Sequence, residues 1–195
     1  HPQAKLLAEI DPENTLRWHF SFQRLSAEQI RDSILAVSGH LDDTLGGKTI
    51  PLRNRQFVFN HLSRDHTNYD ETRRALYLPV VRNHLCDIFE QFDYPDPTMP
   101  TGDRASTIVA PQALLLLNSD LVQESAEIWA KSLLSITSTE NRIRQAYQTA
   151  LGRTPRTEET SSVVSFIRES TSGALVDSAN IDEHAELRAW SLFCQ

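Results

Sequence analysis

Histidine and carboxylate side chains, which can bind zinc or iron, gather in two polar stretches of this sequence. One stretch holds His40, Asp42 and Asp43, and the other holds His61, Asp65, His66 and Asp70. A metal site needs three or four such ligands that converge in space. Polar loops contain the same residue types without any metal, so a solvated loop is the favoured interpretation of both stretches. We predict no metal and no other cofactor.

Two acids in a loop stiffened by prolines could carry a different chemistry. Asp93 and Asp96 lie in the stretch from 93 to 103, and paired carboxylates can act as acid and base in glycoside hydrolysis. Sequence separation does not fix the distance between two carboxyl groups, so the pair alone identifies no reaction. Arg104 follows directly, and a loop pinned by an ion pair between aspartate and arginine is the favoured interpretation.

Arginine is concentrated between residues 50 and 84 of a chain whose formal net charge is −7. A solvated, partly ion-paired face is favoured there over a site for an anion or an acidic partner. Acidic residues outnumber basic ones in both halves of the chain, which disfavours nucleic acid as a partner because binding phosphates needs clustered lysine and arginine. The candidate interaction or pocket residues are Arg73, Arg74, Arg82, Asp93, Asp96 and Arg104.

No arrangement for nucleophilic catalysis is recognisable. The sequence has no G-x-S-x-G motif, and the glycines that precede Lys48 lack the rest of a phosphate-binding loop. Cys86 lies near His84, but side chains two residues apart point in different directions on a helix, so a core cysteine is favoured. Cys86 and Cys194 could pair only if the fold brings them together. We therefore name no catalytic residue.

The elements that position these residues are mostly helical. Ser26 and Gln29 have the spacing of a capping box, in which each side chain binds the other's backbone N–H. Apolar residues then recur at helical spacing up to Gly39, which can take the left-handed conformation that ends a helix. These signals predict a helix over residues 26–38.

Further helices are predicted from Asn83 onward. One spans 83–92, and the next begins near Pro111 and contains the four leucines 114–117, which we expect to lie centrally in the core. Later helices begin at caps and turns near Ser119, Ser138, Thr157 and residue 180. The three tryptophans fall on apolar faces, so core packing is expected for Trp18, Trp129 and Trp190.

The segment at about 50–81 is the exception, because its apolar residues lack helical spacing. Residues 56–59 and 75–81 read as two strands of a small β-hairpin, with Pro79 restricting the second strand to an edge. The predicted fold is therefore mainly α, a single compact domain over residues 1–195 with about six or seven helices and this insertion. No run approaches the ~20 apolar residues of a membrane span.

Several motifs occur in an order that resembles a known bacterial family. They are DPEN and LRW within residues 11–18, RLSAEQIRDSILAVSGHLDDTLGG at 24–47, RRALYLPVVRN at 73–83, FDYPDP at 92–97, PQALLLLNS at 111–119 and AYQTALGRTP at 146–155. The family is a domain of unknown function that is abundant in planctomycetes. It forms the C-terminal part of large exported proteins that also carry a cytochrome c-like haem module and a companion domain.

This resemblance implies export to the periplasm or cell envelope, with neighbouring domains of the parent protein as partners. The chain begins with His1 rather than methionine, and we expect it to be a piece excised from such a larger protein. The family continues into an Asn-Ser-Asn-Glu-Phe motif after a segment like 189–195, and that motif is absent here. Haem binding by this segment is not implied, because it lacks a C-x-x-C-H motif.

Two main functional hypotheses remain open, and a third possibility is contact with the haem of a neighbouring module through an exposed histidine or Met99. The first is a non-catalytic structural or protein-interaction module, and the second is part of an envelope enzyme that acts on complex polysaccharide through a cleft shared with a neighbouring domain. The enzyme requires Asp93, Asp96 and Arg104 to converge on an open pocket. The module instead requires these groups to be engaged in ion pairs within the chain.

Overall fold

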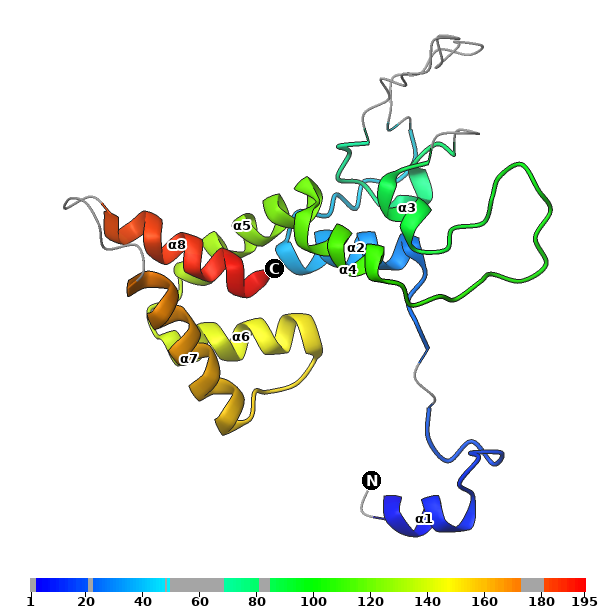
Figure 1. Cartoon of the computed structure of the whole chain (residues 1–195), viewed down its shortest axis with the longest axis horizontal. Coiled ribbons are helices and arrows are strands. Elements are labelled where there is room, and N and C mark those ends of the chain that lie inside the picture. Colours follow the sequence, from blue (N-terminus) through cyan, green and yellow to red (C-terminus); the bar gives the residue numbers. More distant parts are fainter. Residues whose placement is uncertain (1–2, 21–22, 48, 50–68, 81–84, 173–180) are drawn as a thin grey trace.

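The computed structural model describes the chain except residues 1–2, 21–22, 48, 50–68, 81–84 and 173–180 (Figure 1). The described part contains α1 (Ala4–Ile10), α2 (Ala27–Ser38), the 3-10 helix η1 (Ala75–Tyr77), α3 (Asp87–Gln91), α4 (Ala110–Asn118), α5 (Asp120–Leu134), α6 (Thr139–Leu151), α7 (Thr157–Ser172) and α8 (Ile181–Cys194). The prediction of a mainly α fold is confirmed, although the expected six or seven helices are eight among these residues. None of the described helices has both the length and the apolar character needed to cross a membrane.

The prediction of a β-hairpin is wrong for its second strand. Residues 56–59 lie outside the described residues, but Ala75–Tyr77 form a 3-10 helix instead of a strand. Ala75 and Leu78 are buried while Leu76 is 74% exposed, which is a one-turn spacing and not the alternation of a strand. Within the described ranges, the only β pairing is an isolated bridge between Asp42 and Arg73.

Side chains of α2 form hydrogen bonds with backbone groups that a β-strand would have paired with a neighbouring strand. The Arg31 guanidinium donates hydrogen bonds to the carbonyl oxygens of Glu71 and Arg73, the latter at 2.8 Å. The Asp32 carboxylate accepts one from the Ala75 N–H at 2.7 Å. These bonds pair backbone N–H and C=O groups of this segment with side chains of a helix. The segment therefore has less need of hydrogen bonds from a neighbouring strand.

The predicted helix at 26–38 is confirmed as α2, and both of its ends follow the predicted signals. Ser26 Oγ accepts a hydrogen bond from the Gln29 N–H, and Gln29 Oε1 accepts one from the Ser26 N–H at 2.9 Å. Gly39 ends the helix with φ +75°, a conformation that costs a residue with a Cβ more than it costs glycine.

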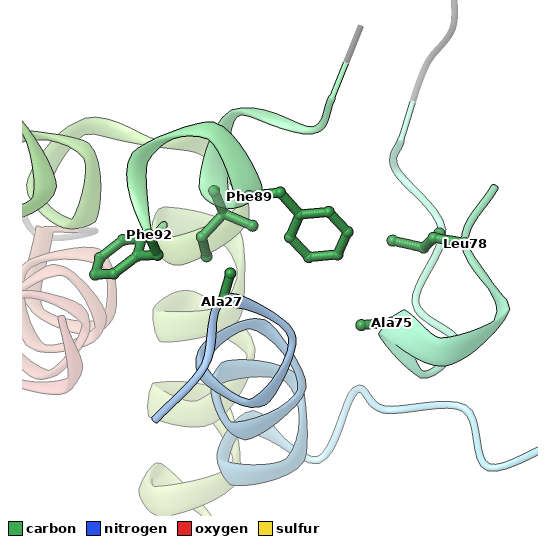
Figure 2. Close-up of a cluster of buried hydrophobic side chains, with 6 residues drawn as sticks. Ala27, Ala75, Leu78, Phe89 and Phe92 are labelled. Atoms are coloured by element: carbon green, nitrogen blue, oxygen red, sulfur yellow. The ribbon is translucent and has the colours of Figure 1, made fainter. Parts of the chain in front are cut away.

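A first hydrophobic cluster lies where α2, η1 and α3 meet (Figure 2). It consists of Ala27, Ala75, Leu78, Ile88, Phe89 and Phe92. Figure 2 shows Ala27 of α2 between Phe92 and Phe89, with the Phe89 ring directed toward Leu78 and Ala75 of the η1 region. Tyr94 extends this cluster by stacking on Phe89, with ring centroids 4.8 Å apart.

A second hydrophobic cluster is built by the last four helices. It consists of Ala130, Leu133, Ile143, Ala146, Val163 and Trp190. Trp190 is only 1% exposed and meets Phe193 edge to face with centroids 5.6 Å apart. Trp129 packs against the same cluster. Core packing is therefore confirmed for two of the three tryptophans.

The four leucines of α4 do not lie centrally as predicted. Leu115 and Leu116 pack against the first cluster, whereas Leu114 and Leu117 are more than half exposed. The main helical contacts of α4 are with α3 and α5. The helix predicted over 83–92 is also shorter than expected, since α3 begins at Asp87 with Cys86 as its N-cap.

The core packing predicted for Trp18 is wrong. Helix α1 buries none of its residues, and Figure 1 shows it away from the other helices. Phe20 is 84% exposed. Trp18 donates its indole N–H to the Asp11 carbonyl oxygen at 2.9 Å, so it closes a local turn and does not reach either cluster.

The turn before α7 supports a prediction about pH. Glu159 receives two hydrogen bonds from Arg153, at 2.8 and 2.7 Å, and one from the Arg156 N–H. The bonds from Arg153, followed by that from Arg156, lower the pKa of Glu159 to about 2. We expect its carboxyl resonance to titrate with a midpoint near pH 2 by NMR, and Arg153→Gln to raise that midpoint toward 4.5.

The control for this experiment is Arg144→Gln on α6, which should leave the Glu159 midpoint in place. Because the folded pKa is lowered, the stability that the pair contributes is present above pH 4.5 and is lost as pH falls toward 2. A midpoint that stays near 2 after Arg153→Gln would show that another group holds the charge.

Candidate functional site

Asp93 lies just after α3 and holds the two ends of the proline loop, residues 93–107, together. Its backbone takes the left-handed conformation with φ +58°. Its carboxylate accepts hydrogen bonds from the Thr107 N–H and the Thr107 hydroxyl, each at 2.8 Å, and Arg24 Nη1 lies 3.8 Å away. The bonds from Thr107 lower the pKa of Asp93. Asp93 is therefore ionised near pH 7, and its carboxylate holds the loop in place.

Arg104 is not the partner of Asp93, contrary to the favoured interpretation of the sequence. Its guanidinium donates to Glu28 Oε2 at 2.9 Å and lies 5.5 Å from the centre of the Tyr94 ring. The hydrogen bond from Arg104 to Glu28 raises the pKa of Arg104. Arg104 thus ties the proline loop to the first turn of α2.

Asp96 is engaged separately inside the proline loop. Its carboxylate accepts hydrogen bonds from the Thr98 hydroxyl at 2.6 Å and from the Thr98 N–H at 2.8 Å, which closes a local turn. The same bonds, the one from the hydroxyl first, lower the pKa of Asp96. Asp93 and Asp96 therefore have different partners, and no described group bridges them.

Gln112 is the residue that sequence reasoning missed. It is 5% exposed on α4. Its Nε2 donates to the carbonyl oxygens of Gln91 at 2.8 Å and Thr107 at 3.2 Å, while its Oε1 accepts from Arg24 at 2.8 Å. Gln112 also accepts a hydrogen bond from the Val109 N–H. A glutamine three residues after a helix start is the sequence signal that could have found it.

The arginine-rich region is described only in part. Arg73 is buried, donates to the carbonyl oxygens of Thr44 and Gly46, and lies over the ring of Tyr77 at 4.8 Å. Arg74 is exposed, and Arg82 lies outside the described residues. Arg73 therefore fixes the loop after α2, and the interaction roles of Arg74 and Arg82 stay predictions.

His40, Asp42 and Asp43 form no metal site, because no three metal-binding side chains gather within the described residues. Asp42 accepts hydrogen bonds from the hydroxyl and the N–H of Thr44, and these, the hydroxyl first, lower its pKa. His61, Asp65 and His66 lie outside the described residues.

The two cysteines are free thiols in different hydrophobic clusters. Burial raises the pKa of Cys86, and it raises the pKa of Cys194 to about 12. Both groups are therefore neutral near pH 7, whereas the thiolate is the form that acts as a nucleophile.

Two cavities of about 610 Å³ each lie elsewhere in the fold. The first cavity lies between α5 and α8 and includes Leu117, Glu127 and His184 in its lining. The second cavity is bounded by α2, the segment before η1, α3 and α5. None of the described candidates from the arginine-rich region or the proline loop lines either cavity.

Comparison with known proteins gives a family for this arrangement. The model of PSD1, described as a protein of unknown function (DUF1553), matches residues 2–167. The chain belongs to the PSD1 family. The PSD1 match includes both α2 and the whole proline loop, while α8 follows it in the sequence. No curated protein and no solved structure matches the chain.

The proline loop supports a prediction about stability and pH. Asp93→Asn should lower the melting temperature at pH 7, because the amide loses the charge that accepts both Thr107 bonds. The pKa of Asp93 is lowered from 3.8, so its contribution is present above pH 3.8 and is lost as pH falls below it. Thermal unfolding of both proteins should therefore differ at pH 7 and converge at low pH.

Asparagine is a suitable substitute because it tolerates a positive φ at least as well as aspartate. The matched control is Asp103→Asn, an exposed aspartate of the same loop, which we expect to leave the melting temperature within about 1 °C. A difference between Asp93→Asn and the parent that persists at low pH would assign the effect to strain and not to charge.

Proposed function

We propose that this chain is a non-catalytic structural or protein-interaction module of a larger exported, haem-associated bacterial protein of the periplasm or cell envelope. The observation that carries the proposal is that the described candidate charges of the proline loop bind groups of the same chain. Asp93 binds Thr107, Asp96 binds Thr98 and Arg104 binds Glu28. Export and the association with haem are supported by the resemblance of the motifs.

The chemistry of these acids also favours a structural role. A general acid at neutral pH needs a raised pKa and free access to its substrate. Asp93 and Asp96 have lowered pKa values, and each uses its carboxylate to accept two hydrogen bonds from one threonine. Neither lines one of the two cavities. The alternative, a polysaccharide-cleaving enzyme with a shared cleft, has no supporting observation among the described residues.

An exposed apolar surface supports the interaction role. We define the α4 surface as the residues Ile108, Val109, Leu114 and Leu117. Ile108 is 93% exposed, and the other three are between 46% and 59% exposed. Val109 is the N-cap of α4, and Leu114 and Leu117 are one turn apart on this helix. Exposed apolar surface is a feature of regions that bind other protein segments. The partner we propose is a neighbouring domain of the same parent polypeptide.

Sedimentation of the chain mixed with the adjoining domain of its parent protein tests the proposal. We expect a 1:1 complex, and we expect Leu114→Asp with Leu117→Asp to weaken it at least about tenfold. The control is Leu151→Asp on α6, which is exposed to the same extent as Leu114 and should leave the affinity unchanged. Circular dichroism of each variant confirms that it remains folded.

Two results would overturn the proposal. One is the absence of any complex at high micromolar concentration. The other is hydrolysis of a polysaccharide by the two domains together that is abolished by Asp93→Asn with Asp96→Asn while the complex persists. That second result would establish the enzyme alternative.

A further inference from the structure

The first cavity has an acidic wall and a basic wall, which belong to different helices. Among the described residues of its lining, α5 contributes Asp120, Glu124 and Glu127, and α8 contributes His184 and Arg188. The spacing is i, i+4, i+7 on α5 and i, i+4 on α8, so each set lies along one side of its helix. A segment that enters this cavity therefore meets carboxylates on one side and basic groups on the other.

Two of these charges lack partners within the described part of the chain. Glu127 pairs with Lys131 of its own helix at 2.6 Å, and Asp120 lies in the first turn of α5, where a carboxylate stabilises the positive helix end. Glu124 and Arg188 form no ion pair with any described residue, nor with each other. Both are therefore available to a partner.

Exposed leucines connect this cavity with the α4 surface. Leu117 and Leu192 of its lining are 57% and 49% exposed, and Leu187 packs against the second hydrophobic cluster from the same lining. Leu117 also belongs to the α4 surface. Gln195 at the end of α8 donates to the Leu117 carbonyl oxygen, so the two regions adjoin. A partner that covers the α4 surface reaches the first cavity at Leu117.

The walls favour a helix as the occupant. The backbone groups of α5 and α8 are bonded within their own helices, so they offer few backbone partners to an inserted segment. Such a segment must satisfy its own backbone, which a helix does. The α8 wall from His184 to Gln195 is roughly 16 Å long, which matches about three turns of a second helix.

We propose that the first cavity binds an amphipathic helix of the neighbouring domain. Its apolar stripe would contact Leu117 and Leu192, a basic side chain on one flank would pair with Glu124, and an acidic side chain on the other flank would pair with Arg188. This inference rests on the proposed function, because it names the segment with which the partner of the α4 surface continues along the chain.

Affinity for the adjoining domain of the parent protein tests the named residues. Glu124→Lys and Arg188→Glu should each weaken the complex about tenfold, since each places like charges together, and Leu192→Asp should weaken it at least about tenfold. The controls are Glu169→Lys on α7 and Arg144→Glu on α6. They make the same charge changes at exposed positions outside this cavity and should change the affinity less than twofold. Circular dichroism confirms that each variant is folded.

Cross-linking identifies the occupant. With p-benzoylphenylalanine in place of Leu192, irradiation of the complex followed by mass spectrometry should join this position to one helical segment of the adjoining domain. That segment should have apolar residues three or four positions apart and side chains of both charges on its flanks. A cross-link to a second copy of this chain, or to a segment without both charges, would overturn the inference.

The result also separates this inference from the proposed function. A complex that is weakened by Leu114→Asp, which lies outside the first cavity, but by none of the three cavity variants would overturn the inference and leave the module function standing. Equal losses in the charge variants and their controls would have the same meaning, because they would reduce the effect to overall charge. The absence of any complex would overturn both.

Discussion

Replacing Trp190 by alanine will lower the free energy of unfolding by about 3–5 kcal/mol. Among the described residues, Trp190 is the largest side chain that is essentially inaccessible to solvent, and it belongs to the cluster built by α5, α6, α7 and α8. Its removal leaves a cavity that helices held by several other contacts cannot fully close. The Arg142 guanidinium, 5.6 Å from the ring centre, loses that contact as well.

Urea unfolding followed by circular dichroism measures this effect without relying on tryptophan fluorescence. The matched control is Leu192→Ala, two residues along the same helix and 49% exposed, which should cost less than about 1 kcal/mol. Equal losses in the two variants would mean that Trp190 contributes no more to the core than a surface leucine.

Replacing Arg31 by methionine will destabilise the chain by about 3 kcal/mol. Arg31 is 1% exposed, and burial lowers its pKa, yet an arginine stays protonated in proteins. Methionine fills much of the space of the stem but donates no hydrogen bond. The carbonyl oxygens of Glu71 and Arg73 accept hydrogen bonds from the guanidinium, and in the variant they would lose these bonds.

Arg144→Met on α6 is the control, because Arg144 is exposed and its replacement should change stability by no more than about 0.5 kcal/mol. Arg31→Lys separates charge from geometry. One ammonium group does not reproduce the planar fork that reaches two carbonyl groups, so we expect only part of the lost stability to return. Full recovery with lysine would show that the charge alone matters.

The parts of the fold that were predictable are those set by neighbouring residues. Both ends of α2 follow from Ser26, Gln29 and Gly39, whose partners lie within a few positions along the chain. Trp190 was assigned to the core from its helical spacing, and it is buried. Periodicity and capping are local physics, and they persist whatever the tertiary arrangement.

The unpredicted parts depend on contacts between distant segments. Arg31 binds backbone about 40 residues away, directly before η1, which replaces part of the strand predicted at residues 75–81. Asp93 accepts hydrogen bonds from Thr107, while Arg104 binds Glu28. The geometry of the loop determines which of several donors lies within hydrogen-bond distance of Asp93. The number of neighbours around α4 is also set by tertiary contacts. The run of four leucines in the sequence therefore does not predict that two of them are exposed.

Helix α5 belongs to both hydrophobic clusters, since Leu121 packs against the first and Leu133 lies in the second. A helix of its 15 residues is about 22 Å long and is stiff along its axis. Helix α5 therefore connects the two hydrophobic clusters rigidly. The spacing of the two clusters is set by the length of α5, and we expect it to be kept under mechanical load.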